Sequence, residues 1–358
     1  MHNNRAWFWD SRIRDKRLNT CWLLRCLALP MLVVLACVPA AAQCTVYVPT
    51  HKSNSVAVID TSTDQVATII PVQFQPLAVA VTPDGAFAYV TNSGWPIGSN
   101  SVSVIDTTTN TVAATIPVGN FPVGVAITPN GAFAYVANYN SNSVSVIATA
   151  TNTVTATVGV GTGPWGVAIT PNGAFAYTAN LNSNNVTVVD TATNTVAATV
   201  PVGNGPVAVA VTPNGAFAYV TNQSSDNVSV INTATNTVVA TVPVVSGSYN
   251  SAPYAIAITP NGAFAYTANA AASTVSVIDT ATNTVIATVP VGTAPHGVAI
   301  TPDGINAYVG NEYSSTVSVI DTRYNTVVDT VNGVAVAPEG VAIKHPAFQA
   351  VPCRYRPI

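Results

Sequence analysis

The stretch "GPVAVAVTPNGAFAYVTNQSSDNVSVINTATNTVVATVPV", residues 205–244, decides the fold. It contains the apolar runs "VAVAV", "AFAYVTN", "NVSVIN" and "TVVATVPV", and the second and third alternate with the period of two expected of β-strands. The Asn-Gly pair between the first two runs accepts the positive φ of a tight hairpin turn. The stretch therefore predicts four consecutive antiparallel strands, here called A, B, C and D.

The unit recurs along the chain. Its strand B tyrosine returns at spacings of 42, 46, 42, 42, 47 and 42 residues, as Tyr47, Tyr89, Tyr135, Tyr177, Tyr219, Tyr266 and Tyr308. A four-stranded unit repeated at this period is typical of a β-propeller, in which each copy forms one blade. Because proline cannot donate to a strand ladder, the prolines late in strand D place D at an edge: Pro71, Pro117, Pro201, Pro243 and Pro290. We predict an all-β, seven-bladed β-propeller over residues 43–345.

The two ends of the repeat region complement each other. "CTVYVP", residues 44–49, begins at strand B, whereas "EGVAIKH", residues 339–345, is a lone strand A. We expect these two strands to pair and close the ring, and residues 346–358 to form a tail. Cys44 and Cys353 flank this seam and are predicted to form a disulfide, which would contribute about 4–5 kcal/mol by constraining the unfolded chain. An outer-membrane barrel is excluded because it needs strands of about 9–11 residues.

Residues 1–42 predict a secretory signal peptide. Six basic residues precede an apolar run from Leu27 to Val38, and Ala40-Ala41-Ala42 resembles a cleavage site. The apolar run is too short to span a bilayer. "VLAC", residues 34–37, offers the alternative of a bacterial lipid anchor at Cys37. The chain is therefore expected to be exported, to the periplasm or to the cell surface and beyond, with no transmembrane segment.

Without residues 1–42 the chain keeps 5 basic and 12 acidic residues, a net charge of −7. Nucleic-acid binding is excluded because it requires a basic surface. A soluble, monomeric protein is expected. The sequence contains no Cys-x-x-Cys-His haem motif, phosphate-binding glycine loop or Gly-x-Ser-x-Gly elbow. No cofactor is expected, unless a divalent metal serves a hydrolase.

Comparison of the copies separates a constant face from a diversified one. The A-to-B turns exchange only Asn and Asp, and the aspartates that end strand C are interpreted as turn residues that bond to the backbone. The D-to-A connection varies freely: Leu77, Val123, Trp165, Val207, Tyr254, His296, Glu339. The B-to-C loop varies as well: His51, Ser93, Tyr139, Leu181, Gln223, Ala270, Glu312. A meander places both connections on one face, so the binding site is predicted there, around the channel mouth.

Two sets of residues on this face are candidates. The binding set is mainly aromatic and suits a protein or glycan partner: Trp95, Tyr139, Trp165, Tyr249, Tyr254, His296 and Glu339. The alternative set is catalytic: His51, His296, Glu312 and Glu339. Two imidazoles and two carboxylates can hold a divalent metal or act as acid and base. A chance gathering of polar side chains on a solvated rim is the competing interpretation.

"AYVTN", residues 88–92 and 218–222, together with "SVSVIDT", residues 101–107, resembles the YVTN family of β-propeller repeats. The resemblance covers residues 44–345 and implies an exported or surface-associated propeller whose relatives are mostly binding modules. It implies little chemistry, because fold is not function. Our first expectation is therefore a non-enzymatic binding and scaffold protein. The alternative is a hydrolase, because lactonase-like seven-bladed propellers resemble this architecture and use a channel-mouth site.

Overall fold

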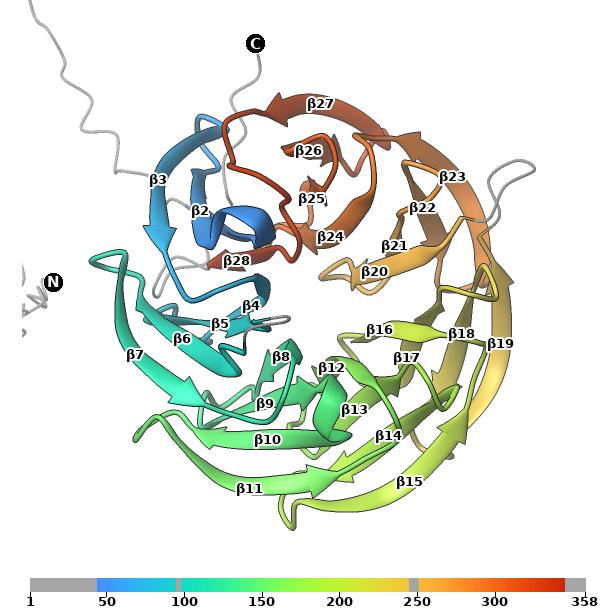
Figure 1. Ribbon diagram of the computed structural model, residues 1–358. Coiled ribbons are helices and arrows are strands. Elements are labelled where there is room, and N and C mark those ends of the chain that lie inside the picture. The colour runs from blue at the N-terminus through green and yellow to red at the C-terminus, as the bar shows by residue number, and fades with distance from the viewer. Residues whose placement is uncertain (1–43, 95–97, 245–250, 345–358) are drawn as a thin grey trace, which may run out of the picture. The chain divides into compact units, whose positions relative to one another are not determined.

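The computed structural model describes residues 44–94, 98–244 and 251–344, and these residues form a ring of seven four-stranded antiparallel sheets (Figure 1). The predicted all-β, seven-bladed propeller is confirmed. The predicted signal peptide and the tail lie outside the described residues. No helix within the described ranges has the length and hydropathy of a membrane span.

Each sheet begins at the ring axis with strand A and ends at the periphery with strand D (Figure 1). The A strands are β4 (Pro76–Val81), β8 (Pro122–Ile127), β12 (Pro164–Ile169), β16 (Pro206–Val211), β20 (Pro253–Ile258), β24 (Pro295–Ile300) and β28 (Ala342–Lys344). The B strands are β1 (Thr45–Thr50), β5 (Phe87–Asn92), β9 (Phe133–Asn138), β13 (Phe175–Asn180), β17 (Phe217–Asn222), β21 (Phe264–Asn269) and β25 (Asn306–Asn311).

The two outer strands of each blade have the same regularity. The C strands are β2 (Ser55–Asp60), β6 (Ser101–Asp106), β10 (Ser143–Ala148), β14 (Asn185–Asp190), β18 (Asn227–Asn232), β22 (Thr274–Asp279) and β26 (Thr316–Asp321). The D strands are β3 (Gln65–Pro71), β7 (Thr111–Pro117), β11 (Thr153–Gly159), β15 (Thr195–Pro201), β19 (Thr237–Pro243), β23 (Thr284–Pro290) and β27 (Thr326–Val331). The short 3-10 turns η1 (His51–Ser53) and η2 (Tyr139–Ser141) follow β1 and β9. The edge position predicted for strand D from its prolines is confirmed.

The chain ends close the ring as expected. β28 is the innermost strand of the sheet β28-β1-β2-β3, and it pairs with β1 from Thr45↔Lys344 to Tyr47↔Ala342. A single bridge, Thr50↔Pro338, continues the contact, so the pairing is interrupted at residues 339–341. Cys44 is fully buried at this seam. Its predicted partner Cys353 lies outside the described residues, so the disulfide stays a prediction.

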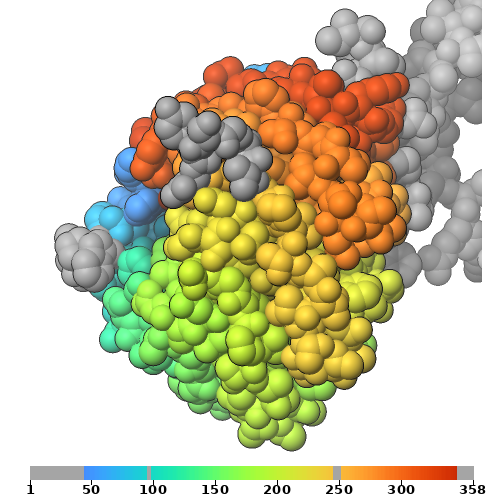
Figure 2. All heavy atoms as spheres, turned by 90° about the vertical axis from the view of Figure 1, so that its right-hand side faces the viewer, coloured from blue at the N-terminus to red at the C-terminus, as the bar shows by residue number. Residues whose placement is uncertain are grey.

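The hydrophobic core lies between adjacent blades. Strands B and C are almost wholly buried, whereas strand D exposes every second residue or more. Tyr177 of β13 illustrates the packing, because it belongs to the same hydrophobic cluster as Val209, Val220 and Ile231 of the following blade. Figure 2 shows the blades succeeding one another around the wall of the ring, from green through yellow to red. Each blade therefore buries its inner strands against its neighbour, which explains why a single repeat could not fold alone.

The marker tyrosines bind the blades together. Each hydroxyl donates a hydrogen bond to the side chain of an Asn or Asp in the C-to-D turn of the next blade: Tyr47–Asn110, Tyr89–Asn152, Tyr135–Asn194, Tyr177–Asn236, Tyr219–Asn283, Tyr266–Asn325 and Tyr308–Asp64. All seven acceptors have positive φ, which Asn and Asp tolerate better than other side chains. The Asn of the recurrent "TNT" is thus explained by the positive φ at its position and by the tyrosine hydroxyl of the adjacent blade that donates to it.

The turn roles assigned to the aspartates and asparagines are confirmed. Asp106 Oδ1 accepts hydrogen bonds from the backbone N–H groups of Thr108 and Thr109. Asn130 Oδ1 accepts from the N–H of Ala132 and the hydroxyl of Thr128. These side chains therefore close the turns, as the sequence predicted.

Among the seven side chains that accept a hydrogen bond from a marker tyrosine, only Asp64 is a carboxylate. A substitution of Asp64 therefore tests the contact with Tyr308 that joins the last blade to the first. Burial raises the pKa of Asp64, and the nearby Asp329 and Asp60 add to the rise. A carboxyl group whose pKa is raised in the folded state contributes stability at low pH, and this contribution is lost as the pH climbs through that raised pKa. Asp64→Asn should therefore increase the free energy of unfolding at pH 7, and the gain should shrink as the pH falls toward the ordinary pKa of an aspartate.

Urea unfolding at pH 7 and at about pH 4, near the ordinary aspartate pKa, measures this effect. Asn236→Asp, which installs a carboxylate opposite Tyr177, is the matched control and should destabilise at pH 7. A less stable Asp64→Asn at pH 7 would show that the charged hydrogen bond from Tyr308 outweighs the cost of burial.

Candidate functional site

In six of the seven blades the variable residue of the D-to-A connection lies at a register shift at the start of strand A, whereas Glu339 precedes β28. In β24 the register shifts between Pro295 and Gly297, so His296 is the extra residue, and Tyr254 holds the same place in β20. A bulge redirects the side chain of the extra residue away from the regular ladder. These side chains consequently face the channel. Gly297 permits the close packing, because a Cβ there would collide with the Glu339 carbonyl oxygen.

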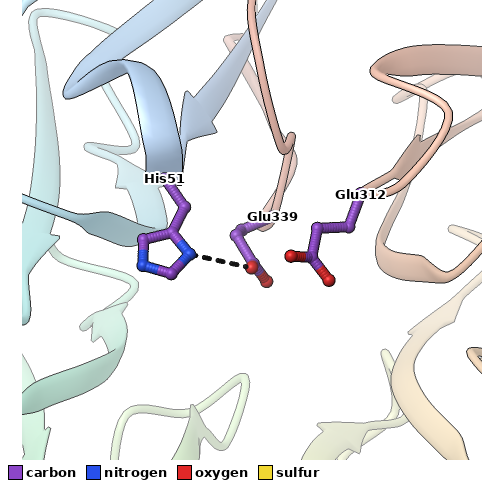
Figure 3. A group of neighbouring side chains, drawn as sticks. All are labelled: His51, Glu312 and Glu339. Atoms are coloured by element: carbon purple, nitrogen blue, oxygen red, sulfur yellow. Dashed lines mark ion pairs between the residues drawn. The ribbon is translucent and has the colours of Figure 1, made fainter.

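Four titratable residues from two adjacent blades converge at the channel mouth. His296 Nδ1 lies 2.9 Å from Glu339 Oε2 and 3.5 Å from Glu312 Oε2. His51 Nδ1 lies 3.6 Å from Glu339 Oε1. Figure 3 shows Glu339 between His51 and Glu312, with both carboxylates turned toward the same point. The sequence predicted this set of residues on one face, and the structure brings all four within contact.

The backbone holds these side chains from three directions. His51 begins η1 directly after β1, and its N–H donates to Ala337 O. Glu339 N–H donates to Pro49 O, which ties the connection before β28 to the end of β1. Glu312 follows β25, and its N–H donates to Ala294 O. Backbone hydrogen bonds between separate segments therefore fix the positions of these three residues.

Burial and mutual contact set the charges of the cluster. Glu312 and Glu339 are only 8% and 7% exposed. Burial alone would raise the pKa of Glu339, but the contacts with His296 and His51 outweigh it and lower that pKa. The contact with Glu339 raises the pKa of His51 against the opposing effect of burial. The carboxylate of Glu339 is thus kept ionised inside a largely buried site.

Aromatic rings extend from this cluster around the channel. Tyr254 stacks on His296 with ring centroids 4.1 Å apart and an interplanar angle of 12°. Trp165 meets Tyr254 edge-on at 6.0 Å and Tyr139 edge-on at 5.5 Å. Burial raises the pKa of Tyr254 well above its usual value, so its hydroxyl stays protonated. Three of the aromatic residues predicted to bind a ligand, Tyr139, Trp165 and Tyr254, therefore form one continuous arc with His296.

Trp165 and Tyr254 of the arc and His296 and Glu339 of the cluster line one cavity of about 130 Å³ in the centre of the ring. All seven blades contribute to it, and the lining side chains include Leu77, Trp165, Tyr254, His296 and Glu339. Apolar walls with a few polar groups at one side are typical of a small-molecule site. The geometry suits a small ring held against the aromatic side, with the imidazole and carboxylate groups beside it.

Four further residues bear on the site: two that the sequence predicted and two that it did not. Trp95 and Tyr249 lie outside the described residues. Sequence comparison missed Lys52, whose Nζ lies 3.6 Å from Glu312 Oε1, and Phe121, which packs edge-on against Tyr139. Phe121 has a φ of 55°, and its position in the other copies holds Gln, Gly or Ala. That single bulky residue before the strand A proline was the available signal.

Solved structures share this architecture. A chain of hydrazine synthase from Kuenenia stuttgartiensis is 28% identical, with a TM-score of 0.71 over 78% of this chain and 92% of that one. A putative 6-phosphogluconolactonase from Bacteroides fragilis is 18% identical, with a TM-score of 0.70 over 84% of this chain and 98% of that one. The periplasmic gluconolactonase of Pseudomonas aeruginosa is 19% identical, with a TM-score of 0.72 over 85% and 99%. No curated protein matches the chain.

The expectation of a non-enzymatic binding and scaffold protein is wrong. The family described as "Lactonase, 7-bladed beta-propeller" matches residues 42–159, 125–197 and 164–344, and together with the structures above it favours the lactonase-like alternative. The expectation rested on the aromatic loop residues and on a repeat resemblance that implies little chemistry, and neither shows whether titratable side chains converge in space. On the evidence of this match, the chain belongs to the seven-bladed β-propeller lactonase family.

Proposed function

We propose that this chain hydrolyses a lactone whose ring sits in the central cavity. The observation that carries the proposal is the position of the four titratable residues. His296 and Glu339 line the cavity. His51 contacts Glu339, and Glu312 contacts His296. The family to which the chain belongs supports the same reaction class.

The residues suit the two proton transfers that the reaction needs. Water attacks the lactone carbonyl and gives up a proton, and the ring oxygen takes up a proton as the carbon–oxygen bond breaks, which yields a hydroxy acid. His296, oriented by Glu339 and by the stacked Tyr254, is placed to accept and return that proton. Glu339 stabilises the charged imidazole and fixes its plane.

The surroundings favour an uncharged substrate. The carboxylates of Glu312 and Glu339 give the cavity mouth a negative charge, which repels a phosphate group. Lys52, the cation nearest to them within the described residues, contacts Glu312 rather than the cavity lining. Trp165 and Tyr254 line the cavity with aromatic surface, which suits an apolar or sugar ring. We therefore expect a neutral lactone to be preferred over a phosphorylated one.

A pH-stat assay tests the proposal with three substrates: a γ-lactone, a neutral sugar δ-lactone and a 6-phosphorylated sugar δ-lactone. The wild-type chain should accelerate opening of the neutral lactones above the buffer rate, and Trp165→Ala should raise KM more than it lowers kcat, because it removes binding surface. Absence of acceleration with all three substrates would refute the proposal. Faster turnover of the phosphorylated lactone would refute the substrate preference alone.

Two features of the sequence extend the proposal to the location of the protein. The YVTN-like repeats and the segment 1–42 support a function outside the cytoplasm. The assay is therefore best made on protein secreted by its own N-terminal segment.

A further inference from the structure

We infer that His51, His296, Glu312 and Glu339 form a binding site for one divalent transition-metal ion of the zinc type at the mouth of the channel. Two imidazole nitrogens with two carboxylate oxygens are a donor set that Zn²⁺ and neighbouring first-row divalent ions prefer. The inference goes beyond the proposed hydrolysis. It stands on the positions of the donor atoms, and it holds whether or not a lactone is the substrate.

The donor atoms are spaced like ligands around one ion. Zn–N and Zn–O bonds of about 2.0–2.2 Å place two tetrahedral ligands about 3.4 Å apart. The measured separations are 3.5 Å for His296 Nδ1 and Glu312 Oε2, 2.9 Å for His296 Nδ1 and Glu339 Oε2, and 3.6 Å for His51 Nδ1 and Glu339 Oε1. One donor atom from each of His51, Glu312 and Glu339 lies within 4.8 Å of the other two. Small side-chain rotations therefore bring all four onto one ion.

The ring of His51 gives an independent reason. Its Nδ1 atom is buried and has no hydrogen-bond partner within the described part of the chain, although it points at Glu339 (Figure 3). A buried nitrogen in that state costs free energy, and a metal bond removes the cost.

The charges and the position of the cluster fit the same ion. Glu312 and Glu339 are nearly buried, and Lys52, with its side chain 56% exposed, approaches only from the solvent side of Glu312. Two carboxylates buried this close together require a compensating positive charge. A divalent ion held by these four residues would lie beside the cavity that His296 and Glu339 line. Such an ion lowers the pKa of bound water and so would supply the nucleophile for hydrolysis.

Metal binding can be measured without substrate. Tag-free protein is freed of metal with a chelator and titrated with Co²⁺ and Zn²⁺ at pH 7.5, with visible absorption for Co²⁺ and competition against a chromogenic chelator for Zn²⁺. We expect one ion per chain, and Co²⁺ bands of a four- or five-coordinate site. His51→Ala and Glu312→Gln should each weaken binding by more than the roughly 10–100-fold typical of losing an outer partner. Asp303→Asn, on the opposite face, should bind like the wild type.

The outcomes separate the metal site from the proposed function. Absence of stoichiometric binding by the wild type, or binding that both ligand variants retain, overturns the metal site. If a variant fails to fold, as judged by far-UV circular dichroism, the Co²⁺ spectrum of the wild type decides, and octahedral bands alone count against the site. Lactone turnover in protein that binds no metal refutes only the metal site. Metal binding without turnover supports the site and counts against the hydrolase.

Discussion

Glu339→Gln is expected to lower kcat/KM for lactone hydrolysis by about 10²–10⁴-fold, the range that a positioned proton-transfer group contributes. Glu339 contacts both His296 and His51, and it lines the cavity. The substitution keeps the size of the side chain and removes its charge. The imidazolium that forms when His296 accepts a proton then loses its nearer counter-charge, at 2.9 Å, and keeps only the Glu312 carboxylate at 3.5 Å, so the barrier rises.

Steady-state kinetics with the best neutral lactone measures the loss, and thermal unfolding reports whether the variant is folded. Asp303→Asn is the matched control, because it also replaces a carboxylate by its amide but lies in an A-to-B turn, where Asn172 and Asn214 hold the same place in other blades. We expect the control to keep wild-type kinetics. A folded Glu339→Gln within about twofold of the wild type would exclude this cluster as the proton-transfer site.

Tyr177→Ala is expected to reduce the free energy of unfolding by about 3–5 kcal/mol, as for other fully buried aromatic residues. The ring of Tyr177 is 0% exposed and fills the contact between two blades. Its removal leaves a cavity that strands of two different sheets would have to close together. The effect should therefore exceed that of any substitution on the exposed face of strand D.

Tyr177→Phe separates the ring from the hydroxyl. It keeps the packing and removes only the hydrogen bond to Asn236, so we expect a loss of about 1 kcal/mol. Urea unfolding followed both by Trp fluorescence and by far-UV circular dichroism measures both variants and checks that the transition is cooperative. Equal losses for the two variants would show that the hydrogen bond, rather than the packed ring, holds the blades together.

The repeat explains why so much of the fold was predictable. Hairpin turns at Asn-Gly pairs, alternating strands and edge prolines are local effects of φ, side-chain direction and missing N–H groups, and each acts within a few residues. Because seven near-copies repeat the same pattern, a strand or turn that is ambiguous in one copy can be assigned by comparison with the others. Even the closing pair of strands followed from the sequence, because the first copy lacks strand A and the last supplies it.

The sequence predicted on which face of the propeller the site lies, but not how its side chains are arranged. Comparison of the copies placed His51, His296, Glu312 and Glu339 on the diversified side, and it identified Tyr139, Trp165 and Tyr254 there as well. The comparison could not show whether these side chains are scattered around the rim of the channel or contact one another in one site. The bulges at the start of β20 and β24, which turn Tyr254 and His296 into the channel, are register shifts between strands that no local sequence pattern predicts.

By itself, the sequence determined the period, the four strands of each blade, the turns and the closure of the ring. The tertiary structure alone decided the bonds from each tyrosine to the next blade and the meeting of His51 with Glu339, whose facing nitrogen and oxygen atoms lie 3.6 Å apart. The physical reason is the range of the forces that set each feature. Turns and strands depend on neighbours along the chain, whereas distances between blades depend on how the packed cores of all seven sheets fix the circumference of the ring.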